Sequence, residues 1–363
     1  MGISISRSRT RKVLAGGLPI GGGAPISVQS MTNVPTTDVE AVCSQINMLA
    51  ARGTEIVRVA VPDRESADAL RSIIERSPVP VVSDIHFDPE LAILALEAGT
   101  DKLRLNPGNI RRRSDIWKIC EKASELQVPI RIGVNSGSIP GDLRDKYGGV
   151  NRDSMWAAAQ RHLVFFEETG FKDIVLSLKS SDPMLTVEVN RLASAECDYP
   201  LHLGVTEAGP QLTGSVRSAV ALSVLLAEGI GDTIRVSLSG SPEKEPVVGW
   251  EILSSLDIRR RFPRVISCPT CARTRIDVAE LAESVQESLE GKVGNITIAV
   301  MGCEVNGPGE AREANIALIG TPSGIQLFID GKNTGGIPGS DIQGYLDGIV
   351  DSYIRKSEKT AGG

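Results

Sequence analysis

Aromatic residues and positive charge are both scarce in this 363-residue sequence. Phe, Trp and Tyr make up 4% of the chain, and 45 Asp and Glu outnumber 39 Lys and Arg, which gives a formal net charge of −6. General nucleic-acid-binding proteins are usually basic, and those that hold single strands stack the bases on aromatic side chains. The composition therefore argues against a nucleic-acid-binding function.

Long hydrophobic runs are also missing. The longest run, 219–227, is interrupted by Ser223 and is far shorter than the roughly 20 residues that a membrane-spanning helix needs. The first residues, MGISISRSRTRKVLAGG, are basic but contain no apolar segment of the kind found in secretory signals. We therefore expect a soluble protein located in the cytoplasm.

Cysteine is too rare for a disulfide framework, with six residues in a chain of this length. Three of them, Cys43, Cys120 and Cys197, are scattered, whereas Cys268, Cys271 and Cys303 lie in one region. In a reducing compartment, clustered cysteines are more often metal ligands or catalytic groups than disulfide partners. We therefore expect a metal centre in the last third of the chain.

Eight short runs rich in β-branched residues recur along the first two-thirds of the sequence. They are PISVQSM from Pro25, EIVRVAV from Glu55, PVVSDIH from Pro80, KLRLNPG from Lys102, PIRIGVN from Pro129, DIVLSLK from Asp173, PLHLGVT from Pro200 and TIRVSLS from Thr233. A helix-like stretch separates each pair; after the third run it begins at Asp88-Pro89 and ends at Gly99. Eight such units in about 260 residues predict an α/β fold, a (β/α)8 TIM barrel, in preference to a doubly wound sheet.

The longest gap and the end of the chain depart from this pattern. The segment GSIPGDLRDKYGGVNRDSM, residues 137–155, reads as an extended loop and a candidate lid, or as a tolerated surface insertion. A helix near 243–257 and the basic RRRFP segment, 259–263, precede four further strand candidates, in VISCPTC, NITIAVMGC, ANIALIG and GIQLFIDG, with helices near 276–290 and 340–354. We therefore expect a barrel domain over 1–260 and a smaller α+β domain over 261–363.

Polar residues follow or end the predicted barrel strands, where the active sites of barrel enzymes lie. The candidates are Arg58, Asp84, His86, Arg104, Asn106, Arg131, Asn135, Lys179, Thr206, Glu207, Arg235 and Ser237. Five of these are cations from five different strands, although the chain as a whole is acidic. Convergent cations of this kind suit the oxygens of a phosphate or diphosphate. The expected substrate is a phosphorylated polyanion.

Three of these candidates could handle protons. Asp84 and His86 lie two residues apart and so share one side of their strand, and Glu207 follows the seventh strand. Ion pairing with neighbouring arginines is the alternative explanation for Asp84 and Glu207. The other histidines suggest ordinary roles: His202 a hydrogen-bonded core residue, and His162 a surface residue of a helix.

The cysteine region contains a C-x₂-C pair, Cys268 and Cys271, and Cys303 within GCEVNGPGE. No fourth cysteine and no histidine occurs in this domain, and Glu310, past the turn NGPG, is the nearest anionic residue that could complete the set. A structural zinc site would favour cysteine or histidine as its fourth ligand. Three thiolates and a carboxylate therefore favour a 4Fe–4S cluster, with zinc as the alternative.

Nine segments together resemble the 4-hydroxy-3-methylbut-2-enyl diphosphate synthase family. They are APISVQSMTNVPTTDVEA, IVRVAVP, SDIHFD, LRLNPGNI, RIGVNSGS, HLGVTEAG, EGIGDTIRVSLS, SCPTCART and GCEVNGPGEA, which run in order from about Pro25 to Gly320. The resemblance implies an iron–sulfur oxidoreductase of isoprenoid biosynthesis by the methylerythritol phosphate route. Its reaction is the two-electron reductive ring opening of 2-C-methyl-D-erythritol 2,4-cyclodiphosphate, with loss of water.

The resemblance also implies the site and its partners. The cluster ligands would be Cys268, Cys271, Cys303 and Glu310, and the electron donor a flavodoxin or ferredoxin. The diphosphate-binding positions fall on Arg58, Asp84, His86, Arg104, Asn106, Arg131, Asn135, Lys179, Arg235 and Ser237. The short RRRFP segment matches the compact two-domain bacterial form. Two rival classes are a non-redox phosphate-binding barrel of the pteroate-synthase or aldolase type with a structural zinc site, and a non-enzymatic iron–sulfur sensor.

The chain geometry predicts a shared active site. Fifteen helical residues over 243–257 would carry the chain about 22 Å away from the end of the eighth strand. The RRRFP segment spans at most about 18 Å, too little to bring the cluster domain back around its own barrel. A head-to-tail homodimer, with each cluster over its partner's barrel, would solve this, and the resemblance implies the same arrangement. The alternative is a large hinge motion within one chain.

Overall fold

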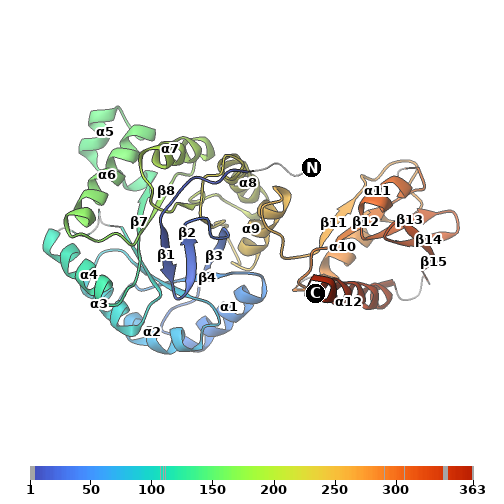
Figure 1. Cartoon of the computed structure of the whole chain (residues 1–363), viewed down its shortest axis with the longest axis horizontal. Helices are drawn as coiled ribbons and strands as arrows, with labels where there is room; N and C mark the ends of the chain where they lie inside the picture. Colours follow the sequence, from blue (N-terminus) through green and yellow to red (C-terminus); the bar gives the residue numbers. More distant parts are fainter. Residues whose placement is uncertain are drawn as a thin grey trace. The chain divides into compact units, whose positions relative to one another are not determined.

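A computed structural model describes residues 5–106, 108, 110, 112–289, 291–305, 307–337 and 342–361. These residues form two compact units, the first ending at Arg259 and the second beginning at Arg260. Figure 1 shows the strands of the first unit surrounded by its helices. In the described residues, no helix is long and apolar enough to cross a membrane.

Eight parallel strands form the sheet of the first unit, in the order β8-β7-β6-β5-β4-β3-β10-β9. Their bounds are β3 Ser27–Met31, β4 Ile56–Ala60, β5 Val81–Ile85, β6 Lys102–Leu105, β7 Ile130–Asn135, β8 Ile174–Lys179, β9 His202–Leu203 and β10 Thr233–Ile234. A parallel bridge between Leu176 and Leu201 joins the two ends of the sheet, so the barrel is nearly closed. All eight strands fall within the eight runs of the sequence, which confirms the (β/α)8 prediction.

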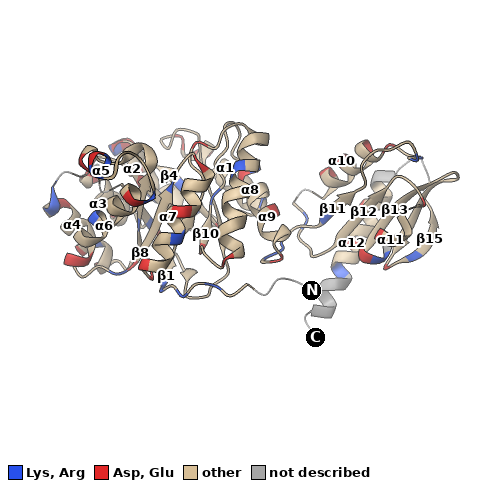
Figure 2. Ribbon diagram, turned by 90° about the horizontal axis from the view of Figure 1, so that it is seen from above, with Lys and Arg blue, Asp and Glu red and all other residues tan. Residues whose placement is uncertain are grey.

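Helices follow the strands and cover the outside of the barrel (Figure 1). They are α1 Val39–Ala51, α2 Arg64–Arg76, α3 Pro89–Ala98, α4 Arg113–Glu125, α5 Gly141–Tyr147, α6 Arg152–Glu168, α7 Pro183–Glu196, α8 Gln211–Ala227 and α9 Lys244–Ser255. Asp88 caps α3 by accepting from the Glu90 amide, and Gly99 ends it with a left-handed conformation, as the sequence predicts. Blue and red segments are both visible along the helices in Figure 2, in keeping with a charged outer surface.

The segment 137–155 is not the extended loop expected from its glycines and charges. A 3-10 turn, Ser136–Ser138, leads into α5, and Asn151 then caps α6 through a capping box with Ser154. Arg161 of α6 forms an ion pair with Asp142 of α5. The segment therefore forms a short helix that ends at Gly148 and the start of a second helix, which is capped by the neutral residues Asn151 and Ser154.

A β-hairpin, which the strand pattern did not reveal, precedes the barrel. Strands β1 Lys12–Ala15 and β2 Leu18–Gly21 pair antiparallel. Val13, Ala15 and Ile20 pack against a group of inward-facing barrel residues: Ile56, Val82 and Val175. The hairpin therefore covers the end of the barrel where the strands begin.

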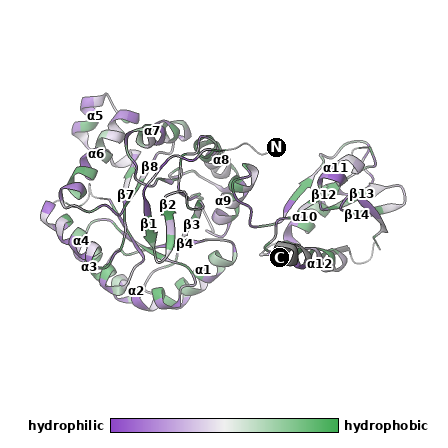
Figure 3. Ribbon diagram, in the orientation of Figure 1, coloured by the Kyte–Doolittle hydropathy of each residue, from purple (hydrophilic) through white to green (hydrophobic). Residues whose placement is uncertain are grey.

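The second unit has a five-stranded mixed sheet in the order β11-β12-β13-β14-β15. Its elements are β11 Arg264–Ser267, α10 Val278–Ser288, β12 Thr297–Met301, α11 Gly307–Glu313, β13 Ile316–Thr321, β14 Gly324–Ile329, β15 Lys332–Gly336 and α12 Ile342–Ala361. Figure 3 shows hydrophobic segments on its strands, whose buried side chains form the core with α10 and α12. This confirms the α+β expectation; β15 and α11 are additional, and Ser340, the expected start of the last helix, lies outside the described residues.

Candidate active site

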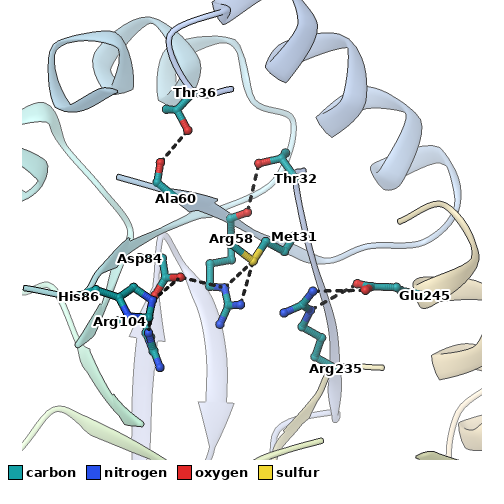
Figure 4. A network of polar contacts seen from close by, with 10 residues as sticks. All are labelled: Met31, Thr32, Thr36, Arg58, Ala60, Asp84, His86, Arg104, Arg235 and Glu245. Atoms are coloured by element: carbon teal, nitrogen blue, oxygen red, sulfur yellow. Dashed lines mark hydrogen bonds and ion pairs between the residues drawn. The ribbon is translucent and has the colours of Figure 1, made fainter. Parts of the chain in front are cut away.

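Asp84 lies at the centre of a polar network where the barrel strands end (Figure 4). Its Oδ1 is 2.9 Å from Nη1 of Arg104, and its Oδ2 lies 3.7 Å from Nε of Arg58 and 3.4 Å from Nε2 of His86. The same Nη1 of Arg104 is 2.7 Å from Nε2 of His86. The register of the strands brings these side chains together, because Asp84 of β5 pairs with Ala60 of β4 and with Arg104 of β6.

The Asp84 carboxyl is held in its ionised form. Burial raises its pKa, but Arg58, His86 and Arg104 together outweigh burial and hold the pKa well below its ordinary value. At neutral pH this carboxylate therefore accepts hydrogen bonds and has no proton to give. His86, the other member of the pair, is half exposed.

Arg58 also contacts a residue that the sequence did not single out. Its Nε and Nη2 lie 3.0 and 2.8 Å from Sδ of Met31, which faces it from β3. Burial, opposed by Asp84, lowers the pKa of Arg58 to about 10, so the guanidinium remains charged at neutral pH. A thioether is a weak acceptor, and the contact leaves this charge incompletely satisfied.

Glu245 of α9 is a second residue missed from the sequence. It is buried and accepts from Nε and Nη2 of Arg235, at 3.3 and 3.2 Å (Figure 4). The hydroxyl of Ser30 donates to Glu245 at 2.9 Å and the amide of Leu238 at 3.2 Å. These contacts fix the Arg235 guanidinium beside the end of β10. A Glu in the first turn of a helix is so common that its sequence position carries no signal.

Arg131 and Lys179 are the two cations of the network without a carboxylate partner among the described residues. Arg131 is 1% exposed, and its Nε and Nη2 have no hydrogen-bond partner. Lys179 is 7% exposed, and its Nζ lies beside Gly204, where a Cβ would come within 2.5 Å of the Arg235 carbonyl oxygen, so glycine is required there. Burial, followed by the charges of neighbouring arginines, lowers the pKa of both side chains well below the ordinary values, and an anionic ligand beside them would favour their charged forms.

The remaining predicted site residues of the barrel lie around the same end. Asn106 follows β6 and is 8% exposed, Asn135 is the last residue of β7, and Ser237 follows β10. Glu207 is not buried and has a left-handed backbone, with φ 53°, which costs a non-glycine residue roughly 1–3 kcal/mol. Among the described residues Glu207 forms no ion pair, so pairing with an arginine does not explain its position. Thr206 donates its amide to the Ser180 carbonyl at 3.1 Å.

The position of Arg131 differs from the expectation. Arg131 is the second residue of β7, not one of its last, and it pairs with Arg104 of β6. Strands of a closed barrel are staggered, so the depth of a side chain depends on its register and not on its place within its own strand. The cations therefore occupy more than one level of the barrel interior.

The histidines also differ from their expected roles. His162 is 6% exposed, not a surface residue, and burial lowers its pKa to about 4. His202 is fully buried as expected, but neither ring nitrogen has a hydrogen-bond partner among the described residues, so it is not a satisfied core histidine. Periodicity places both side chains on the correct elements but does not reveal their partners.

In the second unit, two of the cysteines follow neighbouring strands. Cys268 comes directly after β11 and Cys303 two residues after β12, and these strands pair in parallel. The amide of Gly302 donates to Sγ of Cys268 at 3.2 Å. A Cβ at 302 would come within 2.5 Å of Thr274, so glycine permits this close approach. Both sulfur-bearing residues therefore lie at one end of the sheet.

The other two candidate ligands lie in flanking segments. Cys271 is exposed, in a turn that Thr274 stabilises by accepting from the Cys271 amide at 3.1 Å, and the Arg273 amide lowers the pKa of its thiol. Glu310 lies in the first turn of helix α11. The sequence suggested a turn NGPG before Glu310, but Gly307, Pro308 and Gly309 already belong to this helix, and Asn306 lies outside the described residues. Within those residues, no three His, Cys, Asp or Glu side chains are close enough to hold a metal ion.

The donor set nevertheless fits an iron–sulfur cluster. Three cysteines and a carboxylate are located on or beside adjacent elements, one sulfur already accepts a backbone hydrogen bond, and the domain sequence has no histidine. Metal centres commonly assemble their own ligands, because binding and the final local folding are coupled. The separation of these side chains in the protein alone is compatible with such a site.

Two family models match the chain, one for each unit. The GcpE TIM-barrel domain matches residues 10–250 and the GcpE protein C-terminal domain matches residues 264–352. A 4-hydroxy-3-methylbut-2-en-1-yl diphosphate synthase (flavodoxin) of Geobacter sulfurreducens is 47% identical over 96% of this chain and 99% of its own length. One of the same name from Nitratidesulfovibrio vulgaris is 51% identical over 88% of this chain and 82% of its own.

Solved structures resemble the barrel alone. The 7,8-dihydropteroate synthase of Vibrio fischeri covers 68% of this chain and 98% of its own, with a TM-score of 0.50 and 13% sequence identity. At this identity the likeness concerns the fold and carries no information on the reaction.

Proposed function

The chain belongs to the GcpE family, and on this premise we propose that it converts 2-C-methyl-D-erythritol 2,4-cyclodiphosphate to 4-hydroxy-3-methylbut-2-enyl diphosphate. The reaction takes two electrons and two protons, opens the ring and releases water. The observation that carries this proposal is the match of both units to the family, with relatives of that name sharing about half of their residues along nearly the whole chain. These relatives do not favour a non-redox, zinc-containing barrel.

The barrel supplies the site for the diphosphate. Five basic side chains, Arg58, Arg104, Arg131, Lys179 and Arg235, surround two carboxylates, Asp84 and Glu245, so in the described residues the basic groups outnumber the acidic ones by three. The cyclic diphosphate carries two negative charges. Arg131 and Lys179 would make direct charge-assisted contacts with it, and Asn106, Asn135 and Ser237 would donate neutral hydrogen bonds. Asp84 and Glu245 would keep three of the guanidinium groups in fixed orientations.

Two side chains, Glu207 and His86, are candidates for the proton donor. Glu207 lies in a left-handed turn that follows β9, at the open end of the barrel, and its strained backbone is typical of functional positions. His86 is half exposed and is oriented by the ionised Asp84. We propose that one of these two groups donates a proton as a C–O bond of the substrate breaks. Asp84 would orient the ring of His86 and would not itself donate a proton.

Cys268, Cys271, Cys303 and Glu310 would hold the 4Fe–4S cluster. When bound, the cluster would supply single electrons to the substrate, received from a flavodoxin or a ferredoxin. The Gly302 amide, by its hydrogen bond to Cys268, would stabilise negative charge on that thiolate. The proposed location is the cytoplasm, where donors of this class and a reducing environment occur together.

The path of the chain supports a head-to-tail homodimer. Arg259, the last residue of the first unit, forms ion pairs with Glu55 at 2.8 and 2.9 Å and donates to the Ile26 carbonyl. Glu55 and Ile26 directly precede β4 and β3, so the chain leaves the barrel at the end opposite the candidate site. We propose that the cluster domain attached there serves the barrel of a second copy.

Reductive turnover tests the proposed function directly. Anaerobically purified protein with a reconstituted cluster should convert the cyclodiphosphate to the linear diphosphate, with two electrons consumed for each product formed. The control is the same protein after removal of iron, which should be inactive. Full iron loading and a reduced cluster without any product would contradict the proposal.

A further inference from the structure

A second group of polar side chains lies deeper in the barrel than the network around Asp84. This inner layer consists of Ser27 and Gln29 on β3, Lys102 on β6, His202 on β9 and Thr233 on β10. Each is at most 1% exposed. Their side-chain nitrogens and oxygens have no hydrogen-bond partner in the described part of the chain. So many buried polar groups without partners are unusual in a protein interior and point to a role in the site.

Lys102 is the cation of this layer, and its surroundings are positive. It is completely buried, and Arg131 of β7 and Arg58 of β4 are the charges that act on it most. Arg104 follows two residues later on the same strand and so faces the same interior, and Lys102 in turn acts on His202 of β9.

No carboxylate compensates Lys102 among the described residues. Asp84 of β5 is engaged by Arg104, at 2.9 Å, and by Arg58. Glu245 is engaged by Arg235. At the end of the barrel where the strands begin, the hairpin packs its apolar side chains inward. Lys179 of β8 also lies in the interior, where burial, followed by the charges of Arg131 and Arg235, lowers its pKa well below the ordinary value.

The carboxylate that precedes Lys102 in the chain is turned elsewhere. Asp101 accepts from the Val81 amide at 2.7 Å and lies against Gly16 of the hairpin turn. Lys102 is therefore shielded from solvent and has no anion beside it to stabilise an ammonium group. Burial, followed by the charges of Arg131 and Arg58, lowers its pKa well below the ordinary value.

We propose that Lys102 is an uncharged amine in the ligand-free protein and takes up one proton from solvent when the diphosphate binds at the open end of the barrel. This inference rests on the proposed function, because the diphosphate is the anion that would offset Arg58 and Arg131. Once these two charges are compensated, the main electrostatic obstacle to an ammonium group at Lys102 is removed. Substrate binding would then bring a proton into the barrel of an enzyme whose reaction consumes protons.

Calorimetry of substrate binding measures this uptake. The cyclodiphosphate is titrated into oxidised holoenzyme, without a reductant, in two neutral buffers that differ in ionisation enthalpy. Each phosphate of this ligand keeps only a strongly acidic group, so the ligand itself does not titrate near neutral pH. We expect about one proton taken up per site, and an affinity that rises about tenfold for each unit by which the pH falls.

Lys102→Met is the decisive variant, since methionine has a similar length and adds no unsatisfied polar group. It should bind the cyclodiphosphate without proton uptake and with an affinity that no longer depends on pH. Lys102→Gln is a second variant in case the first does not fold. Lys118→Met, at an exposed position of α4, is the matched control and should retain the uptake.

Three results would overturn the inference. Tight binding to the unmodified protein without proton uptake contradicts it whatever the variants do. Uptake that persists in the Lys102 variants would assign the proton to another group, such as Lys179, whose pKa is also lowered, or His202. Absence of any binding by the unmodified holoenzyme would contradict the proposed function itself, and this inference with it.

Discussion

The two units differ in how completely their candidate sites are formed in the protein alone. In the barrel, parallel strands place Arg58, Asp84 and Arg104 within contact distance of one another before any ligand is present. In the second unit, the three cysteines follow strands and turns at one end of a sheet, but no three candidate ligands meet among the described residues. A barrel interior is rigid and enclosed, whereas ligands on loops need the metal centre to draw them together.

This difference indicates that the two candidate sites are stabilised in different ways. The charged residues of the barrel are fixed by packing and register, at the cost of burying cations that lack partners. The cysteine segments avoid this cost, because thiols at an exposed sheet end are well tolerated. We therefore expect substitutions in the barrel to alter affinity and stability by degrees, and substitutions of the cysteines to act in an all-or-none manner.

Loss of any one cluster cysteine should have the largest effect. Cys268→Ser, Cys271→Ser and Cys303→Ser should each reduce the iron content from about four per chain to nearly none and abolish turnover. Cys197→Ser, a half-buried cysteine of the barrel, is the matched control and should keep both. Stoichiometric zinc without iron in strictly anaerobic preparations would show that the cysteines form a structural zinc site instead.

Removal of Glu245 should produce the largest change in stability within the barrel. Glu245→Ala leaves the Arg235 guanidinium buried without its partner, which should cost about 3 kcal/mol of unfolding free energy. The three tryptophans, Trp117, Trp156 and Trp250, all belong to the first unit, so their fluorescence follows its unfolding alone.

Glu251→Ala, at an exposed position of the same helix, serves as the control and should leave the unfolding transition within about 0.5 kcal/mol of its original value. Equal effects of the two substitutions would mean that the contact between Glu245 and Arg235 contributes nothing specific.

Substitution of a diphosphate-binding cation should weaken substrate use and spare the cluster. Arg131→Ala and Lys179→Ala each remove a charge-assisted contact, which should cost about 1.5–3 kcal/mol, or roughly 10- to 150-fold in kcat/KM. The absorption spectrum of the cluster should not change. Arg71→Ala, on the outer surface of α2, is the control. Unaltered kinetics of Arg131→Ala would contradict the proposal that the barrel interior binds the substrate.

Mild acid should affect the barrel and not the second unit, because all three histidines belong to the first. The folded-state pKa of His162 is lowered to about 4, so the unfolded chain binds the proton more readily. The stability that this difference contributes is present above about pH 6.5 and is lost as the pH falls toward 4, by about 1 kcal/mol between pH 7 and pH 5.5.

His162→Gln should flatten this part of the pH dependence, measured by denaturant unfolding with tryptophan fluorescence. His202, whose pKa is lowered mainly by burial and then by Lys179, should destabilise the barrel in the same direction. An unchanged slope in the His162 variant would indicate that this ring becomes charged without cost in the folded protein.

Periodicity was sufficient to predict the eight barrel strands and most helices, because alternation of buried residues and capping groups such as Asp88 and Gly99 are local signals. It missed β1 and β2, since a hairpin that fills a barrel end has no repeating partner in the sequence. It also predicted a loop at residues 137–155, whereas Gly148 is the left-handed end of helix α5 and Asn151 caps α6.

Site residues at the ends of strands could be proposed from the sequence, but their depth and pairing could not. The depth of Arg131 follows from the stagger of the barrel, and the pairing of Arg235 with Glu245 joins a strand to a later helix. Lys102 begins a predicted strand, yet nothing in its local sequence shows that it faces inward without a partner. Such facts depend on contacts between distant elements.

We propose above that the barrel of one copy of the chain and the cluster domain of another form one active site. Subunit mixing tests it most directly: a Cys303→Ser chain, with an intact barrel, is combined with an Arg131→Ala chain, with intact cluster ligands. Each mixed dimer would contain one complete site, so random re-association should restore about a quarter of the original activity from two nearly inactive parents. Demonstrated mixed dimers without any recovery would show instead that each cluster domain serves its own barrel.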